Sequence, residues 1–205
     1  MDNKNYWSSL WLSLIIFVIF IFQQLISNFT DIFILDANIV LTRPWTLITA
    51  VFLHSNLVHL LYNLFGLALF GIILENIIGT KKLLRLFFIA GLAASLASLP
   101  FYDRVLGASG AIFGLIGMLA ILRPRMVIWL YGMPMPMFIA LMVWAAADIF
   151  GIFFPSGTAN IAHLAGLAIG IIFGIINYKK YKENRPEKES IHIDEKNVKG
   201  WEKQF

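Results

Sequence analysis

Two residue types that can act together as a nucleophile and a base, a serine and a histidine, occur in strongly apolar stretches of the chain. Ser109 lies in the segment Gly-Ala-Ser-Gly-Ala, whose glycines allow a tight turn and a close backbone approach to a ligand. His163 lies in the segment Ala-His-Leu-Ala-Gly. If the two side chains meet, the hydroxyl can attack a carbonyl carbon while the imidazole accepts its proton.

Each of these residues also has a purely structural explanation. Serine is common at helix N-termini and at helix contacts in membranes, and a buried histidine often only satisfies a polar neighbour. A serine that begins a helix, by contrast, lies among free backbone N–H groups at the positive end of the helix dipole. Such a position can stabilise an oxyanion, so Ser109 and His163 remain candidates for catalysis.

His59 and Asn63 are four residues apart and therefore share a helix face. Their imidazole and amide N–H groups are suitable donors to a developing oxyanion. The two residues also suit a metal ion, but the sequence places no convincing third ligand nearby. We therefore predict neither a metal nor a cofactor. His54 lies nearer to the helix boundary, and we assign it a structural role.

The elements that position these residues are predicted to be membrane-spanning helices. Of the 205 residues, 59% are hydrophobic, against about 45–50% in a typical soluble domain. Apolar runs that approach the roughly 20 residues of a spanning helix recur along the chain. We predict an all-α polytopic membrane domain over residues 1–178, with six spans at about 10–26, 57–77, 83–99, 109–122, 127–150 and 159–178. A charged tail over 179–205, which includes His192, is expected to be disordered.

The basic residues predict the orientation of these spans. They cluster after the second, fourth and sixth spans, at Lys81, Lys82, Arg85, Arg123, Arg125, Lys179, Lys180 and Lys182. Because basic loops favour the cytoplasm, we expect both termini there, and the second, fourth and sixth spans then begin at the outer side. The four candidate residues consequently lie at a similar depth. The net charge of +4 is interpreted as a topology signal and not as nucleic-acid binding.

Glycines and acidic residues refine this arrangement. Gly110 and Gly114 on the fourth span, and Gly166 and Gly170 on the sixth, form small-residue stripes that allow two helices to pack closely. No acidic residue is expected to complete a catalytic triad. Asp148 falls near the outer end of the fifth span, and Glu75 near the inner end of the second, where we expect a structural role. The prediction is a serine–histidine dyad.

Four local patterns together resemble the rhomboid family of intramembrane serine proteases over about residues 43–178. They are Arg-Pro-Trp-Thr-Leu followed by Phe-Leu-His, then His-x-x-x-Asn, then Gly-Ala-Ser-Gly, then Ala-His-x-x-Gly-x-x-x-Gly, beginning at Arg43, Phe52, His59, Gly107 and Ala162. Glu75 and Gly79 also match the family's pattern after the second span. Each pattern alone is weak, whereas their order and spacing make the set specific.

The resemblance implies a six-helix core with Ser109 as nucleophile and His163 as general base and acid. It also implies that His59, Asn63 and the Ser109 backbone N–H form an oxyanion hole. The family's larger members have a long first loop with a Trp-Arg pair, and the corresponding segment here, 28–43, is short and lacks that pair.

Further positions acquire expected roles from the same resemblance. Gly107 lies where the family's backbone borders the oxyanion hole, and Gly110 also lines the site. Phe113 matches an aromatic position that packs against the family's histidine. The fifth span and the loop 151–158 correspond to the gate and cap through which substrate enters.

The expected function is cleavage of peptide bonds in or near transmembrane segments of other membrane proteins, so the expected partners are such substrates and the lipid bilayer. A catalytically silent relative that escorts membrane proteins would usually have lost Ser109 or His163. A transporter using the histidines as a proton path would not explain Gly-Ala-Ser-Gly at a helix start. The compact size indicates a prokaryotic plasma membrane, although an organelle remains an alternative. The oligomeric state and substrate identity stay open.

Overall fold

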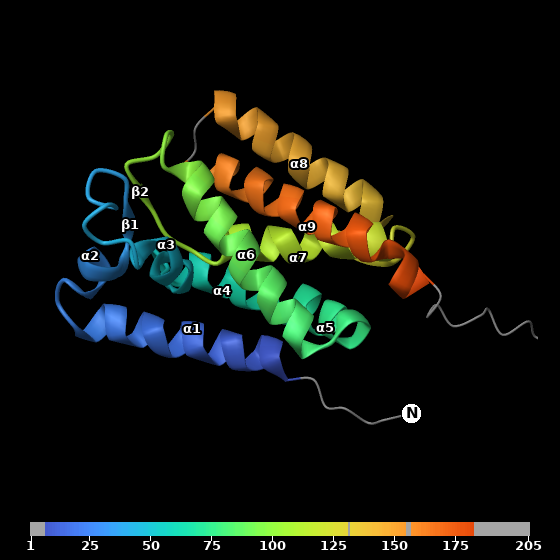
Figure 1. The fold of residues 1–205 in the computed structure, drawn as a ribbon, viewed down its shortest axis with the longest axis horizontal. Helices are drawn as coiled ribbons and strands as arrows, with labels where there is room; N and C mark the ends of the chain where they lie inside the picture. Colours follow the sequence, from blue (N-terminus) through green and yellow to red (C-terminus); the bar gives the residue numbers. More distant parts are fainter. Residues whose placement is uncertain (1–6, 131, 155–156, 183–205) are drawn as a thin grey trace, which may run out of the picture.

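Apolar helices form most of the computed structural model, which describes residues 7–130, 132–154 and 157–182 (Figure 1). The helical elements are α1 (Ser8–Leu25), α2 (Phe29–Phe33), α3 (Thr46–Thr49), the 3-10 turn η1 (Ala50–Phe52), α4 (Leu57–Gly66), the π-helical turn η2 (Leu67–Gly71), α5 (Ile72–Ile78), α6 (Thr80–Ser98), α7 (Ser109–Leu122), α8 (Met137–Phe153) and α9 (Asn160–Lys182). Because α4, η2 and α5 follow without a break, they act as one long helix with a single wider turn.

Two short antiparallel ribbons accompany the helices. Strand β1 (Leu35–Asp36) pairs with β2 (Arg104–Val105), and β3 (Val127–Leu130) pairs with β4 (Met133–Pro136). The first ribbon joins the segment after α2 to the connection between α6 and α7. The chain is thus a helical fold, as predicted, with strands confined to its connections.

Helix α7 lies at the centre of the bundle and is the most enclosed element (Figure 1). Eleven of its 14 residues are buried, which matches a sequence that is apolar on every side. A helix of 14 residues is about 21 Å long, whereas the hydrocarbon core of a bilayer is about 30 Å thick. Helix α7 alone is therefore too short to span the hydrocarbon core.

Close backbone contact joins α7 to α9. A Cβ atom added at Gly166 would overlap the carbonyl oxygen of Gly110, and one at Gly170 would overlap that of Gly114. The side chain of Ala94 on α6 occupies the space beside Gly110 from the other side. These glycines let three helices approach one another without intervening side chains.

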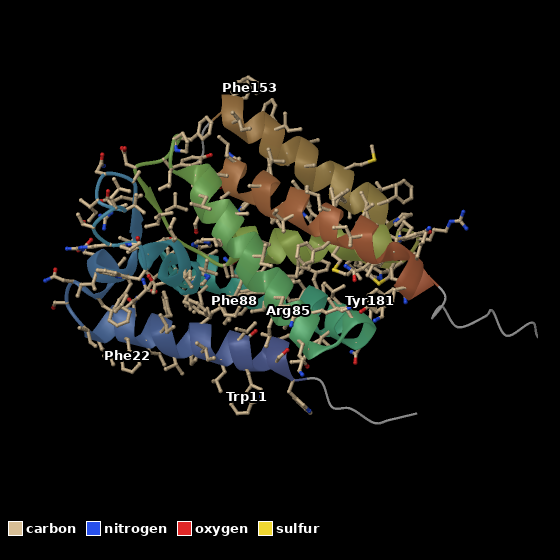
Figure 2. The ribbon with its side chains drawn as sticks, in the orientation of Figure 1. Trp11, Phe22, Arg85, Phe88, Phe153 and Tyr181 are labelled. Atoms are coloured by element: carbon tan, nitrogen blue, oxygen red, sulfur yellow. The ribbon has the colours of Figure 1, made fainter. Side chains whose placement is uncertain are left out.

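The outer helices expose apolar side chains as a bilayer requires. Figure 2 shows Trp11 and Phe22 directed away from the bundle along α1, and Phe153 directed away at the end of α8. Their exposed fractions are 63%, 44% and 74%. Surfaces of this kind are disfavoured in water and favoured against lipid tails.

Glu75 fastens α1 to the inner end of the bundle. Its carboxylate is fully buried and accepts hydrogen bonds from the backbone N–H and the hydroxyl of both Ser8 and Ser9, at the start of α1. The hydroxyl of Thr80 donates to the same carboxylate over 2.7 Å. One acidic side chain thus satisfies the free N–H groups of another helix.

The fifth predicted span is wrong in its first ten residues. Residues 127–136 form the β3–β4 hairpin, and α8 begins only at Met137. Pro134 and Pro136 lie in the second strand, and proline is unfavourable inside a helix because it lacks an N–H and clashes with the preceding turn. The apolar character of 127–136 therefore belongs to a hairpin and not to a helix.

The predicted tail also begins too early. Helix α9 continues through Lys179 to Lys182, so its last turn carries the basic residues assigned to the tail. Residues 183–205, with His192, lie outside the described residues. Among the described helices, three are long and apolar enough to cross a membrane, α1, the continuous helix Leu57–Ile78, and α9 through Tyr181, while α7 and α8 are shorter apolar helices. Six spans therefore remain a prediction.

Candidate active site

Ser109 and His163 meet where the N-termini of α7 and α9 come together. Ser109 is the first residue of α7, and His163 lies in the first turn of α9. The imidazole Nε2 is 2.8 Å from the serine Oγ, a hydrogen-bond distance. The glycine contacts described above account for this approach, because side chains at those positions would hold the two helices apart.

Phe113 fixes the plane of the His163 ring. The two rings are stacked, with centroids 4.3 Å apart and planes inclined by 12°. Phe113 follows Ser109 by one helical turn, so α7 supplies both the hydroxyl and the surface on which the imidazole lies.

Asp148 on α8 lies on the far side of the same ring, contrary to the expectation that no acidic residue is placed to complete a triad. Its Oδ1 is 2.9 Å from Nδ1 of His163, and the two side chains are only 8% and 12% exposed. An ionised carboxylate can only accept a hydrogen bond, so with Asp148 ionised Nδ1 would carry the proton and Nε2 would accept from the Ser109 hydroxyl. The three residues form a serine–histidine–aspartate arrangement.

The sequence contained a signal for Asp148 that went unused. It is the one charged residue of α8, and a carboxylate in an apolar segment is costly unless it has a partner. The fifth and sixth predicted spans run in opposite directions, so the end of one faces the start of the next. This antiparallel geometry brings Asp148 opposite His163, although 15 positions separate them in sequence.

His59 lies beside Ser109 across Gly107. Gly107 has a φ of 122°, which side chains rarely allow, and a Cβ there would lie 3.0 Å from Nε2 of His59 and 3.9 Å from Oγ of Ser109. The backbone N–H of Ser55 donates to Nδ1 of His59 over 3.5 Å. The Ser55 hydroxyl lies closer to the same nitrogen, at 3.1 Å, and can donate or accept. When Nδ1 accepts from Ser55, a neutral His59 carries its proton on Nε2, the atom next to Gly107.

Asn63 lies one turn further along α4 and is buried, with 5% exposure. Its amide Nδ2 donates to the carbonyl oxygen of His59 over 2.8 Å. The side-chain amide has two N–H groups, and among the described residues one of them is used in this bond. The second N–H is left as a donor for a ligand. The Ser109 backbone N–H, at the start of α7, is likewise not used within the helix.

His54 lies behind His59 and not at Ser109. Its ring is almost fully buried and meets that of His59 edge-on, with centroids 5.0 Å apart. Burial, assisted by the nearby His59, lowers the pKa of His54 to about 3, so this ring is neutral at physiological pH. Gln23 of α1 holds the backbone of His54 through two hydrogen bonds. Within the described ranges, no group of three or more His, Asp or Glu side chains is placed to hold a metal ion.

The fold and this site define a helical integral membrane protein with a serine, a histidine and an aspartate in contact at one end of the bundle. The chain belongs to the rhomboid family, since the family model for the Rhomboid domain matches residues 41–180.

Individual relatives support the assignment. The rhomboid protease GlpG of Haemophilus influenzae is 30% identical over 147 residues, which cover 70% of this chain and 74% of that protein. The mitochondrial RHOMBOID-like protein 6 of Arabidopsis thaliana is 33% identical over 137 residues, covering 65% of this chain and 44% of the relative. The mitochondrial Rhomboid protein 1 of Saccharomyces cerevisiae is 32% identical over 158 residues, which cover 70% of this chain and 45% of that protein. The chain thus spans less than half of the length of the plant and yeast relatives.

Proposed function

We propose that this protein is an intramembrane serine endopeptidase that cleaves peptide bonds in or near transmembrane segments of other membrane proteins. The observation that carries the proposal is the 2.8 Å contact between Nε2 of His163 and Oγ of Ser109, at the N-terminus of a helix too short to span a bilayer. A hydroxyl paired with an imidazole is an activated nucleophile, and the adjacent N–H groups are suited to an oxyanion.

In the proposed reaction, the Ser109 hydroxyl attacks the carbonyl carbon of the substrate while His163 accepts its proton. The negative charge that develops on the carbonyl oxygen is stabilised by the Ser109 backbone N–H and by the side chains of His59 and Asn63. His163 then donates the proton to the leaving amine, and a water molecule attacks the acyl-enzyme by the same route in reverse. No cofactor takes part in these steps.

The proposed substrates follow from the position of the site. The backbone N–H and C=O groups of a membrane helix are already hydrogen-bonded to each other. A substrate helix must therefore unwind locally before Ser109 can reach a carbonyl carbon. Substrates with helix-weakening residues near the outer end of a transmembrane segment are therefore expected to be cleaved fastest. The alternative, an escort protein without catalysis, would not require the hydrogen-bonded Ser109 and His163.

The test compares purified wild type with Ser109→Ala and His163→Ala in vesicles that contain a fluorogenic transmembrane substrate. We expect cleavage by wild type and a fall in kcat of at least about 1,000-fold in either variant, because the attacking group or its base is lost. Ser13→Ala, which removes a serine hydroxyl from α1, should cleave as wild type does. Covalent labelling of wild type by a fluorophosphonate probe, absent in Ser109→Ala, gives a substrate-independent check.

Two results would count against the proposal. One is the absence of both cleavage and labelling in wild type, which would favour the escort function. The other is undiminished cleavage by Ser109→Ala or His163→Ala.

A further inference from the structure

Among the residues that the structure describes, Asp148 makes a polar contact with His163 to which the expected dyad gives no role. It approaches the ring from α8, while Ser109 approaches it from α7. We propose that Asp148 is a positioning residue, which fixes the orientation and protonation of His163 so that Nε2 faces Ser109. The role in turnover rests on the proposed function, whereas the effect on the imidazole does not depend on it.

The geometry gives Asp148 control over a motion that stacking on Phe113 leaves free. Stacking fixes the plane of the His163 ring, but a half-turn about the Cβ–Cγ bond returns the ring to the same plane with its two nitrogens on the opposite side. The contact between Nδ1 and Oδ1 at 2.9 Å opposes this flip and, with an ionised carboxylate, favours the proton on Nδ1. With both contacts present, the lone pair of Nε2 points along the 2.8 Å line to the Ser109 oxygen.

Charge is the second contribution. When His163 accepts the serine proton, it becomes a cation in a site where its side chain is 12% exposed. A carboxylate at 2.9 Å stabilises that cation, and it does so more strongly here than in water because the effective dielectric constant is low. The stabilisation arises as charge develops, so it lowers the barrier and not merely the energy of the bound substrate.

A purely structural role explains Asp148 poorly. The other buried residues of α8 are Met137 and Ala140, and an apolar residue at 148 would pack against the bundle without desolvating a charge. The second oxygen, Oδ2, is buried with no hydrogen-bond partner among the described residues. A buried carboxylate with one oxygen lacking a hydrogen-bond partner lowers the stability of the fold. We therefore expect the contribution of Asp148 to come from the contact of its other oxygen with His163.

The activity test uses Asp148→Asn, Asp148→Ala and Asp148→Glu in the full chain. Asn has the same shape without the charge, and its amide can donate to Nδ1 and so favour the wrong tautomer. We expect kcat to fall roughly 100-fold or more in the Asn and Ala variants, with KM within about twofold of wild type, because neither removes a substrate contact. Asp148→Glu, which keeps the carboxylate, should recover part of kcat. Asp103→Asn, the same change at an exposed outer-side loop position, should match wild type.

A second readout does not need a substrate. In protein labelled with ¹⁵N-histidine, we expect His163 in wild type as the tautomer protonated at Nδ1, and a mixture of tautomers in Asp148→Ala. His163→Gln identifies the resonances. Wild-type kcat in Asp148→Asn and Asp148→Ala, an unchanged tautomer in Asp148→Ala, or a loss of activity that only follows a lower unfolding midpoint would each overturn the proposal. A wild type that neither cleaves nor labels refutes the proposed function, while the tautomer measurement still decides the role of Asp148.

Discussion

Asn63 and His59, the two proposed side-chain donors to the oxyanion, lie on one face of α4. The residues are one turn apart on α4, and the Asn63 amide holds the carbonyl oxygen of His59 at 2.8 Å. That bond fixes the amide while leaving its second N–H for a ligand. The Nε2 atom of His59 lies beside Gly107, next to Ser109. Both side chains are thus held before any substrate arrives, which is the condition for efficient oxyanion stabilisation.

Removal of the Asn63 amide should therefore slow the chemical step. We expect Asn63→Ala to lower kcat by about 10- to 100-fold, with a smaller effect on KM, because the donor acts mainly on the charge in the transition state. Asn76→Ala is the matched control: Asn76 makes the same kind of bond to a carbonyl one turn earlier, that of Ile72, but lies exposed at the inner end of the bundle. Steady-state kinetics in vesicles would check this, and equal rates in the two variants would contradict an oxyanion role for Asn63.

At the scale of elements, the contact between α7 and α9 decides whether the site exists at all. The carbonyl oxygens of Gly110 and Gly114 occupy the places where side chains at Gly166 and Gly170 would begin. Ser109 and His163 precede these glycines on their respective helices, so any separation of the two axes lengthens the bond from Nε2 to Oγ. In the proposed enzyme, stability and catalysis are therefore expected to be coupled through this interface.

A single methyl group at this interface should have a large effect. We expect Gly166→Ala to lower the free energy of unfolding by about 1–3 kcal/mol through overpacking and to lower kcat at temperatures where the protein remains folded. Ala168→Val, which adds more bulk on the exposed face of α9, should change neither. Unfolding midpoints in detergent and vesicle kinetics test both statements. A Gly166→Ala variant as stable and active as wild type would contradict this prediction, because α7 and α9 could then move apart without a fall in stability or in kcat.

At the scale of the whole molecule, the exposed Lys81, Arg85 and Asp103 lie at or near the ends of α6, while α1, α8 and α9 expose apolar side chains along their length. Lys81 and Arg85 lie near the start of α6, at the end of the bundle where α1 begins and α9 ends (Figure 1). Asp103 lies in the connection between α6 and α7, near Ser109. The excess of basic residues at the first end predicts that it faces the cytoplasm and that the site opens to the opposite side.

Thiol accessibility checks this orientation directly, because the chain contains no cysteine. In intact bacterial cells, a membrane-impermeant maleimide should label Asp103→Cys, while Lys81→Cys should react only after permeabilisation. Both positions are exposed, so a difference in reactivity reports the side of the membrane. The opposite labelling pattern would reverse the predicted topology and place the site on the cytoplasmic side.

The sequence alone was sufficient for properties that depend on local composition and on motif order. Apolar runs indicated a helical membrane fold, and four spaced patterns indicated the rhomboid family. The start of α7 at Ser109 was readable because glycines precede an uninterrupted apolar run. Hairpin β3–β4 was missed, since apolar residues suit a spanning helix as well as a strand, and the two prolines of the second strand were the available warning.

Only the tertiary structure decided which polar residues touch. Helical periodicity predicted that Ser109 and His163 could meet, but it gave no means of ranking Asp148 against Glu75 as a third group. The structure places Asp148 on His163 and Glu75 at the start of α1, at opposite ends of the bundle. The physical reason is that hydrogen bonding requires distances of about 3 Å. Such distances depend on how helices are rotated and offset when they pack, and no local pattern records that.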